Sequence, residues 1–343
     1  VFPRYYTRTE KLVAVYNGAG GRTMLIVQKF GGSSLADIEK LRRAAKIVLA
    51  ARHREQAVAV VVSAMGETTD TLLNLARAVN PAASARELDA LMSSGEQQSA
   101  ALLAMTLESM GAHAVSLAGW QAGMYTDDEY GDAKLQLIFP SRAAAALKAG
   151  FIPVVTGFQG VNARGDISTL GRGGSDTSAV ALAAALGADR CEIYSDVNGI
   201  YTADPRLVPT ARRLDEIDRR DMLLLSRSGS QVLHEKSVGL SIDSGMDITL
   251  LSSAGEPGYS VVRDLPDERR PLYAGVTRDL GCSLVTLVGR GCCSRTLPEL
   301  AGLLSDAGIS VRGGRMGEGF AGIKVEPAQL IPALNIVHDY YFT

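Results

Sequence analysis

The stretch Leu170-Gly-Arg-Gly-Gly-Ser-Asp-Thr-Ser-Ala179 decides the fold, because it leads directly into the alanine-rich segment Val180–Gly187. Its glycines lack the Cβ atoms that would keep a phosphate away from the backbone. A helix start adds unpaired N–H groups and a positive dipole end. Arg172 presents a planar fork suited to a carboxylate or phosphate, and Asp176 places a carboxylate beside it. A glycine-rich turn alone can be purely structural, but this combination before a helix indicates an anion-binding loop.

A second loop of the same kind lies near the start of the chain. Leu25–Gln28 predicts a short buried strand, followed by Lys29-Phe-Gly-Gly-Ser-Ser34 and the amphipathic run Leu35–Ala51. Lys29 would supply a point charge for phosphate oxygens; an ordinary strand-to-helix turn is the alternative. The chain has no G-x-x-x-x-G-K-[ST] loop, and no G-x-G-x-x-G follows this strand, which argues against a P-loop and a Rossmann site. Two such loops predict a nucleotide phosphate tail held from two sides.

Composition limits the classes of protein that fit. The 343 residues, 46% of them apolar and 21% charged, can bury a full core and predict two domains. The formal charge of −2 gives no indication of a nucleic-acid or anionic-membrane partner. No apolar run reaches the length of a membrane span, and no signal-peptide pattern opens the chain. The cysteines and histidines have neither disulfide-framework nor metal-site spacing, so we expect a cytoplasmic enzyme without a bound structural metal.

Apolar runs alternate with helical patterns over the first two thirds of the chain. The expected strands are Ala57–Ser63, Ala112–Leu117, Ile152–Thr156 and Cys191–Ser195, and the expected helices are Asp70–Val79, Arg86–Met110, Ser141–Gly150 and Asp176–Gly187. Continuously apolar strands that alternate with helices predict an α/β fold with a mostly parallel sheet sandwiched by helices. Ligands of such sheets bind at the carboxyl ends of the strands, where both glycine-rich loops fall.

The two ends of the chain follow different patterns. Residues 1–23 mix Arg, Tyr and Gly and predict a flexible N-terminal extension. Near the C-terminus we expect strands at Ser283–Gly289, Gly308–Arg312 and Gly319–Glu326 and helices at Leu297–Ala307 and Ala328–His338. This order predicts a small α+β module, joined by the charged segment Arg263–Pro271. A packing or dimerisation lobe and a regulatory ligand sensor are both open interpretations of this module.

Six motifs in a fixed order resemble those of the aspartate kinases of the amino-acid kinase superfamily. They are Lys29–Ser34, Val62-Ser-Ala-Met-Gly-Glu-Thr-Thr-Asp70, Ser94-Gly-Glu96, Gly157-Phe-Gln-Gly160, Leu170–Ala179 and Tyr194-Ser-Asp-Val-Asn-Gly-Ile-Tyr-Thr-Ala-Asp-Pro-Arg206. The resemblance implies a catalytic domain over residues 24–265. It also implies an ACT-like module over residues 266–343, of the kind that binds amino-acid effectors in this family.

The resemblance implies transfer of the ATP γ-phosphate, with Mg²⁺ carried by the nucleotide, to the side-chain carboxylate of aspartate. The product, 4-phospho-L-aspartate, starts aspartate-family amino-acid biosynthesis. A carboxylate nucleophile is already ionised at neutral pH, so the absence of a suitably placed histidine is no obstacle. Catalysis is expected from Lys29, which neutralises the transferring group, and from Asp176, which orients Lys29. A secondary role of Asp176 near Mg²⁺ stays open.

The same resemblance implies binding roles for further residues. Arg172 would hold the α-carboxylate of the amino acid and Glu96 its ammonium group, with Thr69 nearby. A helix-start carboxylate favoured by the helix dipole is the structural alternative for Glu96. The remaining expected substrate contacts are Gly173, Gly174 and Ser175, and the expected nucleotide contacts in the first loop are Phe30, Gly31, Gly32 and Ser33.

The segment Tyr194–Arg206 has two interpretations. Its Asn198-Gly199 pair is a turn signal, and from the residues alone it favours a hairpin. The resemblance instead makes Ser195, Asp196, Tyr201 and Arg206 part of the nucleotide pocket, with Tyr201 against the base or ribose.

Some positions depart from the family pattern. The segment Ser228–His234 carries Gln231, a further candidate nucleotide contact, where aspartate kinases usually have a lysine. Their Arg-Ser-Ser-Phe run corresponds to Leu251-Ser-Ser-Ala254, and Lys236 is a candidate replacement for one lost cation. The tail has room for about one ACT module, where the family normally has two. We expect a homodimer because a single module exposes a sheet edge and a helix face, and we expect a weak response to effectors because half of the usual effector pocket is absent. A working aspartate kinase, a diverged kinase of a related amino-acid carboxylate and a catalytically weak regulatory homologue remain the three hypotheses.

Overall fold

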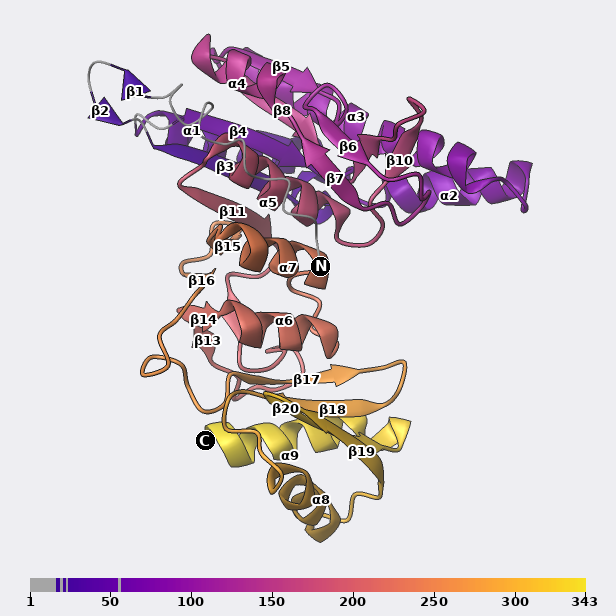
Figure 1. Ribbon diagram of the computed structural model, residues 1–343, viewed down its shortest axis with the longest axis vertical. Coiled ribbons are helices and arrows are strands. Elements are labelled where there is room, and N and C mark those ends of the chain that lie inside the picture. Colours follow the sequence, from indigo (N-terminus) through magenta and orange to yellow (C-terminus); the bar gives the residue numbers. More distant parts are fainter. Residues whose placement is uncertain (1–16, 19–20, 23, 55–56) are drawn as a thin grey trace. The chain divides into compact units, whose positions relative to one another are not determined.

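The computed structural model describes residues 17–18, 21–22, 24–54 and 57–343, with elements labelled in Figure 1. This part of the chain forms two compact units. The first comprises the chain up to Asn198 together with Asp243–Gly258; the second comprises Gly199–Ile242 and Tyr259–Thr343. The expected N-terminal extension lies outside the described residues, except for the short antiparallel strands β1 (Asn17–Gly18) and β2 (Gly21–Arg22). The domain boundary expected near residue 265 stays a prediction.

The first unit is built on parallel strands in the order β15-β11-β3-β4-β8-β5. These are β3 (Leu25–Phe30), β4 (Ala57–Val62), β5 (Ala114–Leu117), β8 (Ile152–Thr156), β11 (Arg190–Ser195) and β15 (Ile248–Ser252). All residues of β3, β4 and β8 are buried, as expected for strands covered by helices on both faces. The mostly parallel α/β sheet predicted from the sequence is confirmed.

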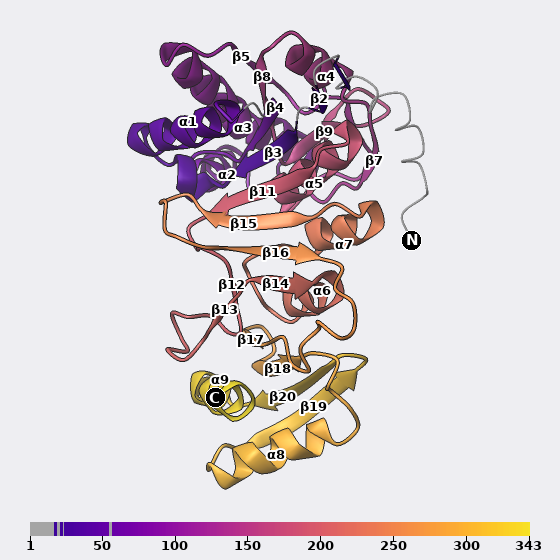
Figure 2. The ribbon, with the colours of Figure 1, turned by 90° about the vertical axis from the view of Figure 1, so that its left-hand side faces the viewer.

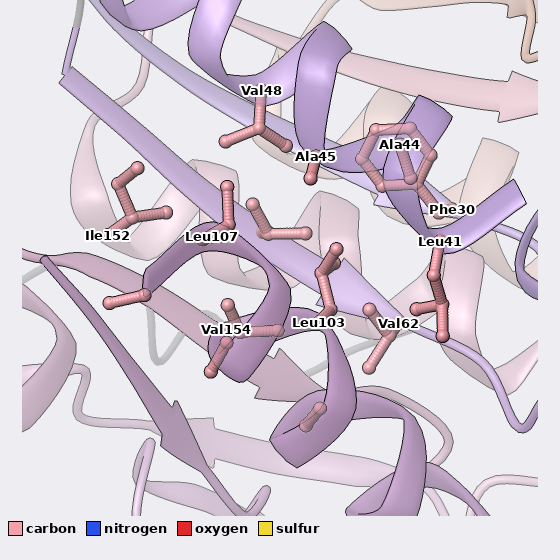
Figure 3. Close-up of a cluster of buried hydrophobic side chains, with 14 of the residues drawn as sticks. Phe30, Leu41, Ala44, Ala45, Val48, Val62, Leu103, Leu107, Ile152 and Val154 are labelled. Carbon is pink, nitrogen blue, oxygen red and sulfur yellow. The ribbon is translucent and has the colours of Figure 1, made fainter. Parts of the chain in front are cut away.

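Helices cover both faces of this sheet. They are α1 (Ile38–Arg52), α2 (Thr68–Val79), α3 (Ala85–Ser109), α4 (Ser141–Lys148) and α5 (Gly174–Leu186), and a 3₁₀ turn at Gly32–Leu35 precedes α1. Figure 2 shows α1 and α3 on the opposite side of β3 and β4 from α5. Between the sheet and α1 and α3 lies an apolar core in which Phe30, Val62, Leu103 and Leu107 are fully buried (Figure 3). Burial of this continuous apolar face stabilises the unit.

A second, smaller sheet in the first unit has the strand order β10-β9-β6-β7. Its strands are β6 (Met124–Thr126), β7 (Leu135–Ile138), β9 (Gln159–Val161) and β10 (Ile167–Thr169). Each has only three or four residues of mixed polarity, which is too short for the alternation of a strand to stand out in the sequence. This sheet is an addition to the predicted fold, and β10 leads directly into the loop that contains Arg172.

The second unit contains the C-terminal α+β module. Its elements are β12 (Ile200–Tyr201), β13 (Arg213–Leu214), β14 (Glu216–Asp218), α6 (Arg219–Arg227), β16 (Tyr259–Arg263), β17 (Gly275–Asp279), β18 (Leu284–Val288), α8 (Thr296–Asp306), β19 (Val311–Gly317), β20 (Phe320–Val325), a 3₁₀ turn at Pro327–Gln329 and α9 (Leu330–Phe342); α7 (Glu235–Ser244) ends just beyond it. The sheet β17-β18-β20-β19 is antiparallel, with α8 and α9 packed on it (Figure 1). The predicted strand–helix–strand–strand–helix order is confirmed, and β17 adds a strand before it.

The segment from β12 to β13 is built into this module. Its residues Ala203 and Val208 belong to the same buried cluster as Leu334 of α9. The Oγ1 atom of Thr202 lies 2.8 Å from Nε2 of His338, also in α9, and accepts a hydrogen bond from the backbone N–H of Arg212 at 3.0 Å. The hydroxyl of Thr202 and the imidazole of His338 share a hydrogen bond in which either atom can donate, depending on the tautomer of the ring. The segment is therefore fixed by both apolar packing and a buried hydrogen bond.

The charged segment Arg263–Pro271 is held against α6. Arg270 lies 2.8 Å from Oδ1 of Asp221 and 3.6 Å from Oδ1 of Asp218, and both carboxylates are 1% exposed. Burial raises the pKa of Asp221, and the guanidinium of Arg270 opposes that rise.

None of the helices in the described part of the chain is long and apolar enough to span a membrane.

We predict that Arg270→Ala lowers the free energy of unfolding by about 3–5 kcal/mol at neutral pH, because it leaves two buried carboxylates without their cation. Arg269→Ala is the matched control, since the neighbouring Arg269 is exposed and its pair with Glu216 should contribute at most about 1 kcal/mol. Urea unfolding of both variants measures the difference. Equal losses for the two variants would show that the buried pair has no special weight.

Candidate active site

The first glycine-rich loop begins at one edge of the large sheet, and the second follows β10 and is joined to the turn after β8 by the N–H of Leu170, which donates to the carbonyl of Phe158. Parallel strands end on one side, so the turns after β3, β4, β8 and β11 lie together at their carboxyl ends. Two backbone hydrogen bonds join these turns directly: Gly66 donates to the carbonyl of Gly32, and Gly157 donates to the carbonyl of Val62. This edge is the candidate active site of the first unit.

Lys29 and Asp176 form the central ion pair of this site. Lys29 occupies the fifth position of the buried strand β3 and is only 9% exposed. Its Nζ atom lies 2.6 Å from Oδ1 of Asp176, which stands in the first turn of α5. A nearly buried ammonium group requires such a partner, and the pair fixes the direction of the lysine side chain. The two loops that the sequence singled out are therefore connected through their charged residues.

The first loop approaches the neighbouring turn closely. A Cβ atom on Gly32 would lie 2.6 Å from the carbonyl oxygen of Ala64, so only glycine fits there. Ser33 is exposed, whereas Ser34 is buried and donates to Oγ of Ser253 at 2.8 Å. The side chain of Phe30 is fully buried and stacks on Tyr194 at 4.8 Å, so only its backbone could contact a nucleotide.

The second loop opens α5. Gly173 precedes the helix, Gly174 and Ser175 begin it and are buried, and Asp176 is the acidic residue of its first turn. The N–H groups at such a helix start have no intrahelical acceptor and favour an anion. Arg172 is exposed, and it forms no ion pair with any residue of the described part of the chain.

Glu96 is a buried carboxylate with spare bonding capacity. It lies on α3 and is 3% exposed; its Oε1 accepts from the backbone N–H of Ala64 at 3.0 Å. Its Oε2 has no hydrogen-bond partner among the described residues. Burial raises the pKa of Glu96 from its ordinary value of 4.5 to about 7, so the ionised form costs folding stability as the pH rises through this range. Glu96 is far from the start of α3, which rules out the helix-start interpretation.

Close packing brings Glu96 to the turn after β4. A Cβ atom on Gly95 would lie 2.9 Å from Cβ of Ala64 and 3.4 Å from Cγ2 of Thr68. Thr69, the next residue of α2, is half-buried. The absent side chain at position 95 thus lets α3 contact both this turn and the start of α2.

The residues of the segment after β11 are divided between the two units. Ser195 donates to Oδ1 of Asp196 at 2.9 Å in the first unit. In the second unit, Arg206 forms a two-point ion pair with Asp204 and Tyr201 is half-buried, while Gln231 is exposed between α6 and α7. The hairpin predicted from Asn198-Gly199 is wrong, because the strands on either side of this pair do not pair with each other. β11 pairs in parallel with β3 and β15, and β12 pairs with β13, so Asn198-Gly199 connects two different sheets.

The structure also locates two residues discussed with the departures from the family pattern. Leu251, in β15, packs against the apolar cluster that contains Phe30 and Tyr194. Lys236 is half-buried in the first turn of α7.

Sequence reasoning missed Asp89, which is completely buried on α3. It accepts three hydrogen bonds: from the N–H and Oγ1 of Thr169 at 2.8 and 2.7 Å, and from the N–H of Gly131 at 2.9 Å. The available signal was its position seven residues before Glu96, two helical turns away on the same face.

Comparison with known proteins agrees with this architecture. The amino acid kinase family profile matches residues 24–252. The chain is 47% identical over 283 residues to the aspartokinase of Mycobacterium tuberculosis, covering 81% of this chain and 65% of that protein. It is 46% identical over 292 residues to the aspartokinase of Corynebacterium glutamicum, covering 84% of this chain and 69% of that protein. The chain thus spans roughly two thirds of the length of these curated relatives.

Solved structures give the same assignment of the fold. E. coli aspartokinase III in complex with aspartate and ADP superposes with a TM-score of 0.79 at 22% identity, covering 93% of this chain and 100% of that chain. The aspartate kinase of Synechocystis superposes with a TM-score of 0.64 at 28% identity, covering 93% of this chain and 70% of that chain. The profile match, these identities and the shared fold together show that the chain belongs to the amino acid kinase family, among its aspartokinases.

Proposed function

We propose that this protein transfers the γ-phosphoryl group of ATP to the side-chain carboxylate of L-aspartate, giving 4-phospho-L-aspartate and ADP. The observation that carries the proposal is the buried Lys29–Asp176 ion pair between the two glycine-rich loops. It places one oriented cation between two anion-binding turns, which is the arrangement that phosphoryl transfer requires. The names of the relatives support aspartate as the acceptor.

The reaction needs positioning and charge neutralisation more than proton transfer. An oxygen of the aspartate side chain forms a bond to the γ-phosphorus, while the bond from that phosphorus to the bridging oxygen of ADP breaks. The attacking carboxylate is already ionised at neutral pH, so no general base is required. Lys29 neutralises negative charge on the transferring group, and Asp176 holds the ammonium group in place.

The nucleotide phosphates fit the first glycine-rich turn. We assign them to the turn Gly31–Ser33, in which the N–H of Gly31 donates to the carbonyl of Tyr194 and the N–H groups of Gly32 and Ser33 are the proposed phosphate donors. No room exists there for a side chain on Gly32. Mg²⁺ would arrive on the nucleotide and neutralise phosphate charge, since no cluster of three metal-ligating side chains occurs within the described ranges. The remaining assigned nucleotide contacts are Ser195, Asp196, Tyr201, Arg206 and Gln231.

The amino-acid head is assigned to two charged residues. Glu96 has an unsatisfied buried oxygen, which suits the ammonium group, and the exposed fork of Arg172 suits the α-carboxylate. Thr69 is assigned to the same subsite because α2 begins beside Glu96. Gly173, Gly174 and Ser175 complete it at the start of α5.

We also propose how the chain is organised as an enzyme. Residues 24–265 are the catalytic domain and residues 266–343 an ACT-like module. The exposed strand β19 lies at the edge of the sheet of this module, and an open edge favours pairing with a second copy, so we propose a homodimer. All four cysteines are free thiols, which fits a reaction in the cytoplasm.

A coupled assay of ADP release tests the proposed function. Aspartate, glutamate and close analogues of aspartate are offered separately at saturating Mg·ATP, and aspartate should give the highest kcat/KM. Preference for another carboxylate would identify a diverged amino-acid kinase. No turnover with any acceptor would identify a regulatory homologue, consistent with Gln231 and Leu251 at positions where aspartate kinases have cations.

We predict that Lys29→Met lowers kcat roughly 10³-fold or more while ATP still binds, because Lys29 acts mainly on charge in the transition state. Lys40→Met is the matched control, since Lys40 on α1 has a side chain that is 40% exposed and pairs only loosely with Asp37 at 3.9 Å. Steady-state kinetics and ATP binding by calorimetry measure both effects. Near-normal kcat in Lys29→Met would assign the catalytic cation elsewhere.

We predict that kcat/KM for aspartate falls as the pH decreases below about 7, because Glu96 has its pKa raised to about 7 and binds an ammonium group only when ionised. Each unit of pH below this value should cost about tenfold in kcat/KM. A bound ammonium group lowers the pKa of Glu96, so the corresponding limb for kcat should lie at lower pH.

Glu96→Gln is the control for this pH profile. It should have a low kcat/KM for aspartate that no longer changes near pH 7, with the KM for ATP close to that of the parent protein. A limb near pH 7 that persists in Glu96→Gln would assign the titration to another group.

A further inference from the structure

Asp89 connects helix α3 to two separate segments of the first unit. Its Oδ2 accepts from the backbone N–H groups of Thr169 and Gly131, and its Oδ1 accepts from Oγ1 of Thr169. The side chain is 0% exposed. A carboxylate has no donor of its own, so it can satisfy three converging donors that a neutral apolar residue would leave buried and unpaired.

The two segments are the ones that shape the Arg172 loop, which we define as Leu170–Gly174. Thr169 ends β10 and immediately precedes this loop, and its carbonyl accepts from the N–H of Ala133 at 2.8 Å. Gly131 and Ala133 belong to the connection between β6 and β7. Asp89 therefore holds both the start of the loop and the β6–β7 connection directly, and the bond between Ala133 and Thr169 joins these two segments to each other.

Gly171 shows how tightly these segments pack. It has a φ angle of +70°, and a Cβ atom there would lie 3.1 Å from the carbonyl oxygen of Gly131, with the carboxylate of Asp132 closer still. The Arg172 loop therefore packs against the β6–β7 connection and has little room to shift independently of it. A change at Asp89 would reach Arg172 through both segments.

The same face of α3 carries the other end of the proposed amino-acid subsite. Asp89, Ser93 and Glu96 follow one another at spacings of four and three residues, so they lie along one side of the helix. The carbonyl of Ser93 accepts from Nε2 of Gln159 at 2.9 Å, which attaches β9 to this face. One rigid helix thus supports Glu96 directly and the base of the Arg172 loop through Asp89.

We propose that Asp89 is a positioning residue that holds Arg172 at a fixed separation from Glu96, so that both can bind the head of one α-amino acid. The inference rests on the proposed function, because it assigns the ammonium group to Glu96 and the α-carboxylate to Arg172. Asp89 touches neither substrate. It acts on amino-acid binding and leaves the Lys29–Asp176 pair, and hence phosphoryl transfer, largely unchanged.

The test compares Asp89→Asn with Asp166→Asn. Asparagine keeps the volume of Asp89 but replaces one acceptor oxygen with a donor that faces other donors. Asp166 is the control because it also joins α3 to the β9–β10 hairpin, through Arg86 at 2.8 Å, and it accepts from the hydroxyl of Tyr130 at 2.9 Å, which asparagine can still do through its oxygen. Asp89→Ala is the second variant, and all three are compared with the parent protein in the full-length chain.

Two measurements are made on each variant. Steady-state kinetics at saturating Mg·ATP should show the KM for aspartate raised about tenfold or more in Asp89→Asn, with kcat and the KM for ATP within about threefold. Hydrogen exchange should be faster in peptides covering residues 128–134 and 167–174, whose amides Asp89 holds, and unchanged in peptides of α5. Asp166→Asn should resemble the parent protein in both measurements.

Each outcome decides the inference. An unchanged KM for aspartate in Asp89→Asn overturns it, even if exchange becomes faster, because the role of Asp89 would then be only structural. A parallel loss of kcat in both Asp89 variants overturns it as well. If the parent protein does not phosphorylate aspartate, the proposed function fails. Hydrogen exchange in Asp89→Asn then decides whether Asp89 holds the Arg172 loop: exchange should be faster only in the peptides covering residues 128–134 and 167–174.

Discussion

The structure of the first unit depends on one electrostatic constraint: a lysine in a strand that is buried on both faces must have a counter-charge within reach. Lys29 meets this constraint through Asp176, at the start of the helix that covers β3. The pair fixes the register of α5 on the sheet, and it brings two loops together that are far apart in the sequence. A cation that is desolvated and oriented in this way interacts with an incoming phosphate more strongly than a lysine in water would.

Helix α3 has a second organising role, because its buried face is partly polar. Asp89, Ser93 and Glu96 each connect it to a different segment, and Glu96 keeps an oxygen without a partner among the described residues. A buried carboxylate with a raised pKa is unfavourable for stability, so its retention is typical of a site that gains from binding a ligand. The contacts of Asp89 and Ser93 keep the helix in place despite the loss of stability at Glu96.

The sequence predicts the buried framework well because long apolar runs such as Ala57–Val62 have a single favourable environment. It predicts Lys29 and Asp176 as partners through the family resemblance, and their contact is visible only in the fold. The second sheet escapes prediction because its strands are too short to show a period. The Asn198-Gly199 turn signal misleads because parallel pairing of β11 overrides it, and Asp89 escapes because an acidic residue on a helix usually faces water.

The segment from β12 to β13 has a consequence for recombination and protein engineering. Thr202, Ala203 and Val208 are packed into the C-terminal module, although they follow directly after the Ser195–Asp196 turn of the first unit. A gene cut near residue 265 would therefore strip these residues of His338 and α9 and leave an apolar surface open to solvent. Exchanging the C-terminal module between homologues would therefore require exchanging the β12–β13 segment as well. The segments that must be exchanged together are not continuous in the gene.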